Sequence, residues 1–355
     1  MAKITEAELK AQIKTGEFTN AYLIFGQEGY LKNHYVNLLR KKIVEPTFED
    51  FNFHSYNGKD TTMDEILKDA ELLPMMSSYN FVLVCDYPFD KSESDIKLVQ
   101  EFLKDIPETT ILVFWYDALE FPFKNKDGKI SAKSTKLENA FAKAGSVIEL
   151  NSKTEAELVK MLISGFRKRG YELLPNLAKY LISVSGTDIQ TLQNETEKIC
   201  FYLKGNEITK EAIDKLATKS LQARVNDLSK AILAGDSNKA YAVLNALFFN
   251  NKDVKPDYLL GTITKSYVDM YRVKCAKAAG KPATDIKNYF FYPYDSYINN
   301  AVRDSANLSV KQLRKSLDVL MDADNALKST STDDRLIFEE LVVKLMLIAK
   351  EVKYD

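Results

Sequence analysis

Short apolar segments alternate with segments of helical periodicity in the first part of the chain. Five of the apolar segments are strand-like, and they cover residues 21–26, 51–57, 80–87, 109–117 and 145–150. Helical patterns lie between them near residues 28–44, 61–72, 94–106 and 131–144. The third and fourth strand-like segments are almost continuously apolar, which is typical of a parallel sheet covered on both faces. This order predicts a doubly wound α/β domain over residues 1–151.

The pattern changes after Leu150, where the strand-like segments end. A capping box of Thr154 and Glu157 predicts a new helix. Shorter helical patterns follow at about 175–185, 188–203 and 209–217. Together they predict a small helical domain over residues 152–218.

Long helical patterns fill the rest of the chain. One covers residues 257–279, one opens at Ser309 with Gln312 completing a capping box, and a last one carries apolar residues between 341 and 349. Their apolar stripes are wide enough to build a helical bundle. We therefore predict a helical domain over residues 219–355.

Composition narrows the classes of function. The net charge is -1, so no large basic surface is implied and any contact with nucleic acid must be local. The longest apolar run, residues 111–116, is too short to span a membrane, and the amino terminus lacks an apolar signal core. The 3 cysteines are scattered and there are only 2 histidines, which argues against a disulfide framework, a metal site or a histidine-based triad. We expect a cytoplasmic protein with no membrane partner, no metal and no cofactor.

The first strand-like segment leads into a glycine turn where a phosphate-binding loop would lie. Such a loop needs G-x-x-x-x-G-K-[ST], and counting from Gly26 its last slots fall on Leu31, Lys32 and Asn33. Only Lys32 matches, and Gly29 lies two residues too early. We interpret Gly26, Gly29 and Lys32 as a degenerate phosphate loop that does not bind ATP, with Lys32 as a solvated helix residue.

The end of the third strand-like segment gives an independent test. An ATPase of this architecture would carry Asp and Glu there, to hold magnesium and to activate water. Asp86 is present, but Tyr87 occupies the position of the glutamate and is too weak a base. Two separate gaps predict an ATPase-like fold with no catalytic residues.

Five segments, in the same order and spread over nearly the whole chain, match a family pattern. They are YLIFGQEGYL at 22–31, LPMMSSYNFVLV at 73–84, STKLENAFAKAGSVIEL at 134–150, GTDIQTLQNETEKICFY at 186–202 and DNALKSTSTDDRLIFEEL at 324–341. Through them the chain resembles the delta subunit of the bacterial DNA polymerase III clamp loader. Each segment is short, so their order and the missing catalytic residues carry the resemblance together.

The resemblance implies an AAA+-like module, a helical lid and a helical collar in one subunit of a pentameric loader. This subunit would bind the sliding clamp, the beta subunit, and help to open it for loading onto primed DNA during replication. The collar would contact other loader subunits, and neighbouring subunits would bind and hydrolyse ATP. The holoenzyme is a DNA-directed DNA polymerase, but we expect no intrinsic catalysis in this chain.

The resemblance places the clamp-binding element on Leu73, Pro74, Met75 and Met76. Two adjacent methionines cannot both point inward from one helical turn, and flexible thioether side chains can adapt to an apolar groove on a partner. The family usually carries Leu-Phe or another apolar-aromatic pair here, so the two methionines affect the expected affinity more than the binding mode. The alternative is that both methionines belong to the core between helix and sheet.

Two other functions stay open at this point. One is an active nucleotide hydrolase that uses the degenerate loop, against which Leu31, Asn33 and Tyr87 all argue. The other is a related AAA+ subunit or DNA-processing factor that shares the fold and binds a different partner.

Overall fold

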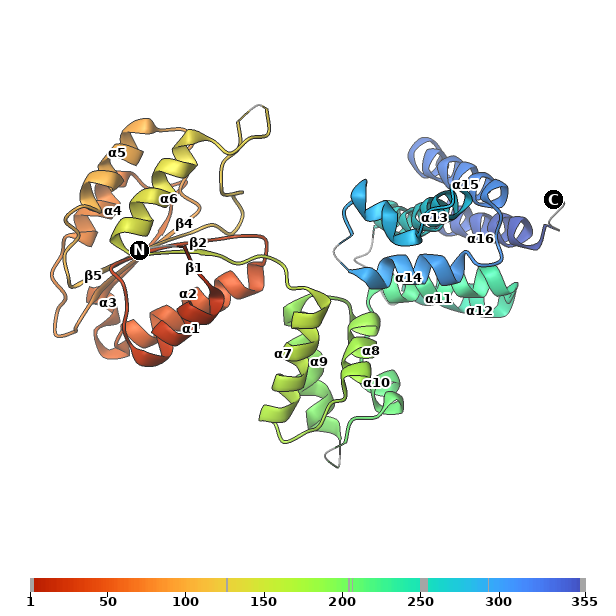
Figure 1. Cartoon of the computed structure of the whole chain (residues 1–355), viewed down its shortest axis with the longest axis horizontal. Coiled ribbons are helices and arrows are strands. Elements are labelled where there is room, and N and C mark those ends of the chain that lie inside the picture. The colour runs from red at the N-terminus through yellow and green to blue at the C-terminus, as the bar shows by residue number, and fades with distance from the viewer. Residues whose placement is uncertain are drawn as a thin grey trace. The chain divides into compact units, whose positions relative to one another are not determined.

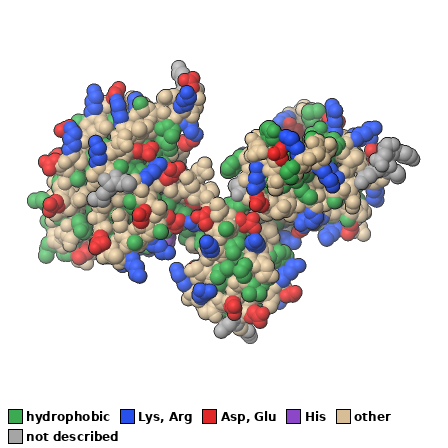
Figure 2. Space-filling view, viewed as in Figure 1, with side chains coloured by type: hydrophobic (Ala, Val, Ile, Leu, Met, Phe, Trp, Pro, Cys, Tyr) green, Lys and Arg blue, Asp and Glu red, His purple; other side chains and the backbone are tan. Residues whose placement is uncertain are grey.

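The computed structural model describes residues 3–125, 127–203, 205, 207–249, 255–292 and 294–351. The chain forms two compact units, residues 1–152 and 153–355. Figure 2 shows Lys and Arg side chains interspersed with Asp and Glu over the visible face of each unit. This mixture of charges agrees with the net charge of -1.

The first unit is built on a parallel sheet of six strands in the order β1-β6-β2-β5-β4-β3. The strands are β1 Lys3–Ile4, β2 Ala21–Phe25, β3 Phe53–Asn57, β4 Asn80–Cys85, β5 Thr110–Trp115 and β6 Ser146–Glu149. All residues of β2 are buried, as are the first five of β4 and of β5. This burial on both faces explains their continuous apolar sequence.

Helices cover both faces of this sheet (Figure 1). One face carries α4 Met63–Ala70, α5 Glu93–Phe102 and α6 Ala132–Ala144, and the other carries α1 Glu6–Thr15, α2 Gly29–Ile43 and α3 Glu49–Asn52. Because the strands are parallel, the carboxyl ends of β2, β4 and β5 meet at one edge of the sheet. The glycine turn and Asp86 both lie at this edge.

The five predicted strands are confirmed, although the start of β3 differs and β1 and α1 were not predicted. Strand β3 begins at Phe53 and not at Phe51, because residues 51 and 52 belong to α3. The two-residue strand β1 was not predicted, since so short a segment has no periodicity. Helix α1 was also missed, although Thr5 and Glu8 form a capping box at its start.

All regular elements in the described part of the second unit are helices. Its first helices are α7 Glu155–Lys168, α8 Pro175–Ser185, α9 Ile189–Tyr202 and α10 Lys210–Leu216. They are followed by α11 Leu221–Ala234, α12 Ser237–Phe249, α13 Pro256–Ala278, the 3-10 helix η2 Ala283–Asn288, α14 Asp295–Asp304, α15 Val310–Ser329 and α16 Asp334–Lys350. The predicted capping boxes of Thr154 and Ser309 are both present.

Helices α11 to α16 share one hydrophobic core, which includes Leu313, Leu341 and Leu345 from the predicted apolar stripes. The division of this unit at residue 218 into two helical domains stays a prediction. Among the described residues, no helix is both long and apolar enough to cross a membrane.

Candidate functional site

The glycine turn after β2 is closed by the main chain that follows β6. Gly26 has a φ of 123°, and a Cβ atom added to it would lie 2.2 Å from the carbonyl oxygen of Leu150. The Leu150 N–H donates to the carbonyl of Phe25 at 2.7 Å, and the Glu28 N–H donates to the carbonyl of Leu150 at 2.9 Å. Gly26 is therefore required by the close approach of Leu150. A Cβ atom on Gly29 would meet no atom of the described residues within 4 Å.

Lys32 corrects the expectation of a solvated helix residue. Its side chain is only 4% exposed, and its Nζ donates a hydrogen bond to the carbonyl oxygen of Tyr116 at 2.6 Å. The physical reason is that Lys32 lies on the buried side of α2, beside Leu31 and Tyr35, and reaches the main chain just beyond β5. The ammonium group thus supplies an internal contact within the unit.

Asp86, at the end of β4, binds the same segment of main chain. Its carboxylate accepts hydrogen bonds from the N–H groups of Asp117, Ala118 and Leu119 at 2.9, 3.1 and 3.0 Å. Burial raises the pKa of the Asp86 carboxyl, but these main-chain hydrogen bonds outweigh it and hold the pKa below its usual value. Lys32 and Asp86 together therefore organise the turn that follows β5.

Tyr87 is a core residue. Its ring is buried against Phe89 and Phe114, and its hydroxyl donates to the Asp95 carboxylate at 2.8 Å. Burial, and then the bond to Asp95, raise the pKa of the Tyr87 hydroxyl well above its usual value. This side chain is therefore no general base at neutral pH.

The predicted apolar element lies on the surface of the first unit. Leu73 is 81% exposed, Met75 is 50% exposed and Met76 is 77% exposed, while Pro74 is half-buried. The alternative that both methionines belong to the core is therefore wrong. Helix α4 ends at Ala70, earlier than the sequence suggested, so the whole element lies in a loop between α4 and β4.

Buried polar side chains fix this loop at two places. The Asn80 carboxamide donates to the carbonyls of Asp69 and Leu72 at 2.7 and 3.1 Å. The Asn52 carboxamide accepts from the Met75 N–H at 2.6 Å and donates to the Met75 carbonyl at 2.9 Å. Sequence reasoning missed Asn52, because it belonged to a predicted strand and its partner lies 23 residues away.

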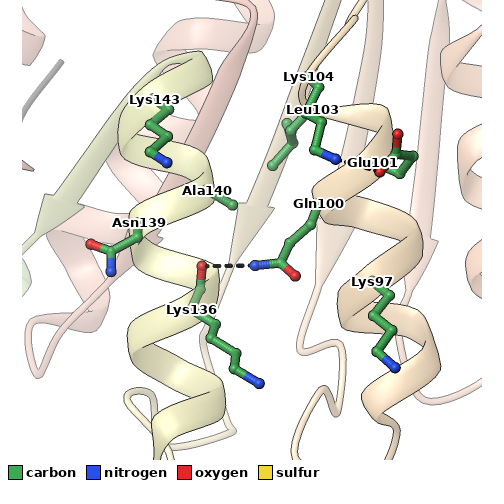
Figure 3. A pocket seen from close by; sticks show the side chains of 9 residues that line it. All are labelled: Lys97, Gln100, Glu101, Leu103, Lys104, Lys136, Asn139, Ala140 and Lys143. Carbon is green, nitrogen blue, oxygen red and sulfur yellow. Dashed lines mark hydrogen bonds and ion pairs between the residues drawn. The ribbon is translucent and has the colours of Figure 1, made fainter.

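A hollow between α5 and α6 forms a second feature of this unit (Figure 3). Its lining includes the lysines Lys97, Lys104, Lys136 and Lys143. Glu101 and Glu93 form ion pairs with Lys104 and Lys136 at 2.6 and 3.3 Å. None of the candidate site residues from the sequence lines this hollow.

Two family models match this chain. The model described as DNA polymerase III, delta subunit, matches residues 22–144, and the model described as DNA polymerase III delta subunit, C-terminal domain, matches residues 222–345. Together they cover more than half of the sequence.

The chain is also similar to two individual proteins named as delta subunits of DNA polymerase III. The chain is 21% identical over 343 residues to the DNA polymerase III subunit delta of Bacillus subtilis (strain 168), covering 94% of this chain and 95% of that protein. It is 19% identical over 304 residues to a probable DNA polymerase III subunit delta of Aquifex aeolicus (strain VF5), covering 81% and 82%.

A solved structure confirms the predicted fold class, a parallel-sheet α/β domain followed by helical regions. The Bacillus subtilis DNA clamp loader delta protein superposes with a TM-score of 0.63 and covers 96% of this chain and 99% of that structure. The sequence identity in this superposition is 18%, so the likeness establishes the fold.

Proposed function

Because this chain belongs to the DNA polymerase III delta subunit family, we propose that it binds the sliding clamp and helps to open it for loading onto primed DNA. The observation that carries this proposal is the exposed apolar loop formed by Leu73, Pro74, Met75 and Met76. Soluble proteins normally bury such a group of side chains unless a partner covers it.

The side chains of this loop are large enough to anchor a protein complex. Each fully buried Met side chain contributes about 1.5–3 kcal/mol. Two of them supply a substantial part of the roughly 8 kcal/mol that a micromolar complex requires, before the cost of ordering the loop is subtracted. Their flexible thioether chains suit an apolar groove on the clamp.

The subunit is proposed to act without hydrolysing ATP itself, so that nucleotide chemistry belongs to neighbouring subunits. Three contacts support this. Lys32 donates to the Tyr116 carbonyl, Asp86 binds main-chain N–H groups, and Tyr87 fills the core. The polar atoms that would meet a phosphate and its magnesium ion are thus engaged inside the protein.

The second unit is proposed to join the subunit to other members of a clamp-loader complex. We propose a lid over residues 152–218 and a collar over residues 219–355 that makes these contacts in the cytoplasm. Exposed apolar side chains on the collar helices support an interface there, namely Met321 on α15 and Leu336 and Leu347 on α16.

Surface plasmon resonance against the purified sliding clamp of the same organism tests the proposal. We expect Met75→Ala with Met76→Ala to weaken binding about 30-fold or more, because both apolar anchors are lost. Ile130→Ala is a matched control, since Ile130 is 57% exposed elsewhere on the same unit. Circular dichroism checks the fold of each variant. Unchanged affinity in the double variant would remove the binding site from this loop.

A further inference from the structure

Asn52 makes three hydrogen bonds from a buried position beside the apolar loop. It is the last residue of α3, and only 1% of it is exposed. Its Oδ1 accepts from the Met75 N–H at 2.6 Å, and its Nδ2 donates to the carbonyls of Met75 and Phe48 at 2.9 and 3.1 Å. One carboxamide therefore binds both main-chain polar groups of Met75 and connects them to α3.

This pattern requires an amide side chain. A carboxylate could accept from the Met75 N–H but could not donate to either carbonyl, and an apolar residue could do neither. Asn52 therefore holds Met75 in a way that an isosteric Asp or Leu cannot reproduce.

The next residue has an unusual backbone conformation. Met76 has a φ of 51°, in the left-handed region that a non-glycine residue with a long side chain rarely adopts. Such a conformation persists only where the surrounding contacts hold it, and it is common at binding sites. Asn52 fixes Met75 directly before it, and Asn80 fixes Leu72 on the other side of the loop.

We propose that Asn52 is a positioning residue for clamp binding. Its carboxamide holds the main chain of Met75 in the exposed conformation before the clamp arrives, so that Met75 and Met76 lose less conformational freedom on binding. Pre-organised loops bind more tightly because this ordering cost has already been met during folding. The inference rests on the proposed function, since it gives the loop the same partner.

The first test needs no clamp. Hydrogen–deuterium exchange on the full chain compares the Met75 amide in the wild type and in Asn52→Ala. Because this amide loses its acceptor, we expect it to exchange about tenfold faster or more, while amides of β4 keep their protection. An unchanged Met75 rate would overturn the proposal.

Asn52→Asp provides a second variant if the alanine variant does not fold. It keeps an acceptor for the Met75 N–H and loses both donations. We expect its Met75 amide to exchange at a rate between those of the wild type and of Asn52→Ala. A clamp affinity equal to that of the wild type would argue against a role for the two donated hydrogen bonds.

The second test separates positioning from a general structural role. Asn52→Ala is measured against the clamp in the wild type and in the variant that carries Met75→Ala and Met76→Ala. We expect about a tenfold loss of affinity in the wild type and no further loss in the double variant, because Asn52 acts through the two methionines.

The outcomes of this cycle are distinct. An equal loss in both backgrounds would show that Asn52 only supports the fold and would overturn the positioning role. A wild-type affinity for Asn52→Ala, with the methionine variant weakened, would also overturn it and leave the proposed function standing. A wild-type affinity for the methionine variant would contradict the proposed site and the positioning role together.

Discussion

Substitutions in the glycine turn after β2 test whether the close approach of Leu150 requires a glycine at position 26. Gly26→Ala places a Cβ atom 2.2 Å from the carbonyl oxygen of Leu150 and forces alanine to a φ of 123°. Either Gly26 or Leu150 must move, and movement of Leu150 breaks its hydrogen bonds to Phe25 and Glu28. Gly29→Ala is the matched control, because in the described part of the chain its Cβ atom would meet nothing within 4 Å.

The expected loss of stability in Gly26→Ala can be worked out from these contacts. A left-handed backbone costs an L-residue about 1–2 kcal/mol, and each lost main-chain hydrogen bond costs about 0.5–1.5 kcal/mol. We therefore expect Gly26→Ala to lower the free energy of unfolding by about 2–5 kcal/mol. The free energy of unfolding of Gly29→Ala should equal that of the wild type to within about 1 kcal/mol, or exceed it slightly.

Urea unfolding followed by tryptophan fluorescence measures this difference in the right part of the chain. Trp115 is the only tryptophan in the sequence and lies in β5, so its signal reports on the first unit. The midpoint for Gly26→Ala should fall to clearly lower urea while that for Gly29→Ala stays near the wild type. Equal midpoints for the two variants would refute the explanation that Leu150 requires the glycine.

Three further predictions use the same unit. Lys32→Ala should cost about 2–4 kcal/mol, because the Tyr116 carbonyl loses a charged donor and a buried side chain is removed; a cost under about 0.5 kcal/mol would instead fit a solvated lysine. Asp86→Asn should cost about 1–3 kcal/mol at neutral pH. Because the pKa of Asp86 is lowered in the folded state, the stabilisation by its carboxylate is complete above the unfolded pKa of about 3.9 and is lost as the pH falls through the folded pKa. The urea midpoints of the wild type and of Asp86→Asn should therefore converge in acid. A difference between the two midpoints that stays constant with pH would contradict this. Met76→Gly should leave stability within about 1 kcal/mol, because the side chain is exposed and the backbone strain is relieved, yet weaken clamp binding; a large loss of stability would show that Met76 packs against its own subunit.

Strands β2, β4 and β5 were predictable because each is buried on both faces and so carries an almost unbroken apolar run. Helices α7 and α15 were predictable because their capping boxes mark the first residue. Helix α3 was not, since four residues are too few to show a helical period and Phe51 continues an apolar run into β3.

The contacts of the candidate site residues could not be predicted from the sequence. Lys32 has the sequence position of a solvated helix residue, and only the fold brings it to the Tyr116 carbonyl. The exposure of Met75 and Met76 also depended on tertiary structure, because an apolar pair beside a strand fits a core equally well. Asn52 had no signal at all, since its contact with Met75 joins separate elements.

Photo-cross-linking can show whether this subunit binds the sliding clamp through the exposed loop. Benzoylphenylalanine replaces Met76 in one protein and Ile130 in a control, both exposed on the first unit. We expect a covalent product with the clamp from position 76 and none from position 130. Products from position 130 alone, or from neither position while the two proteins still bind the clamp, would contradict it.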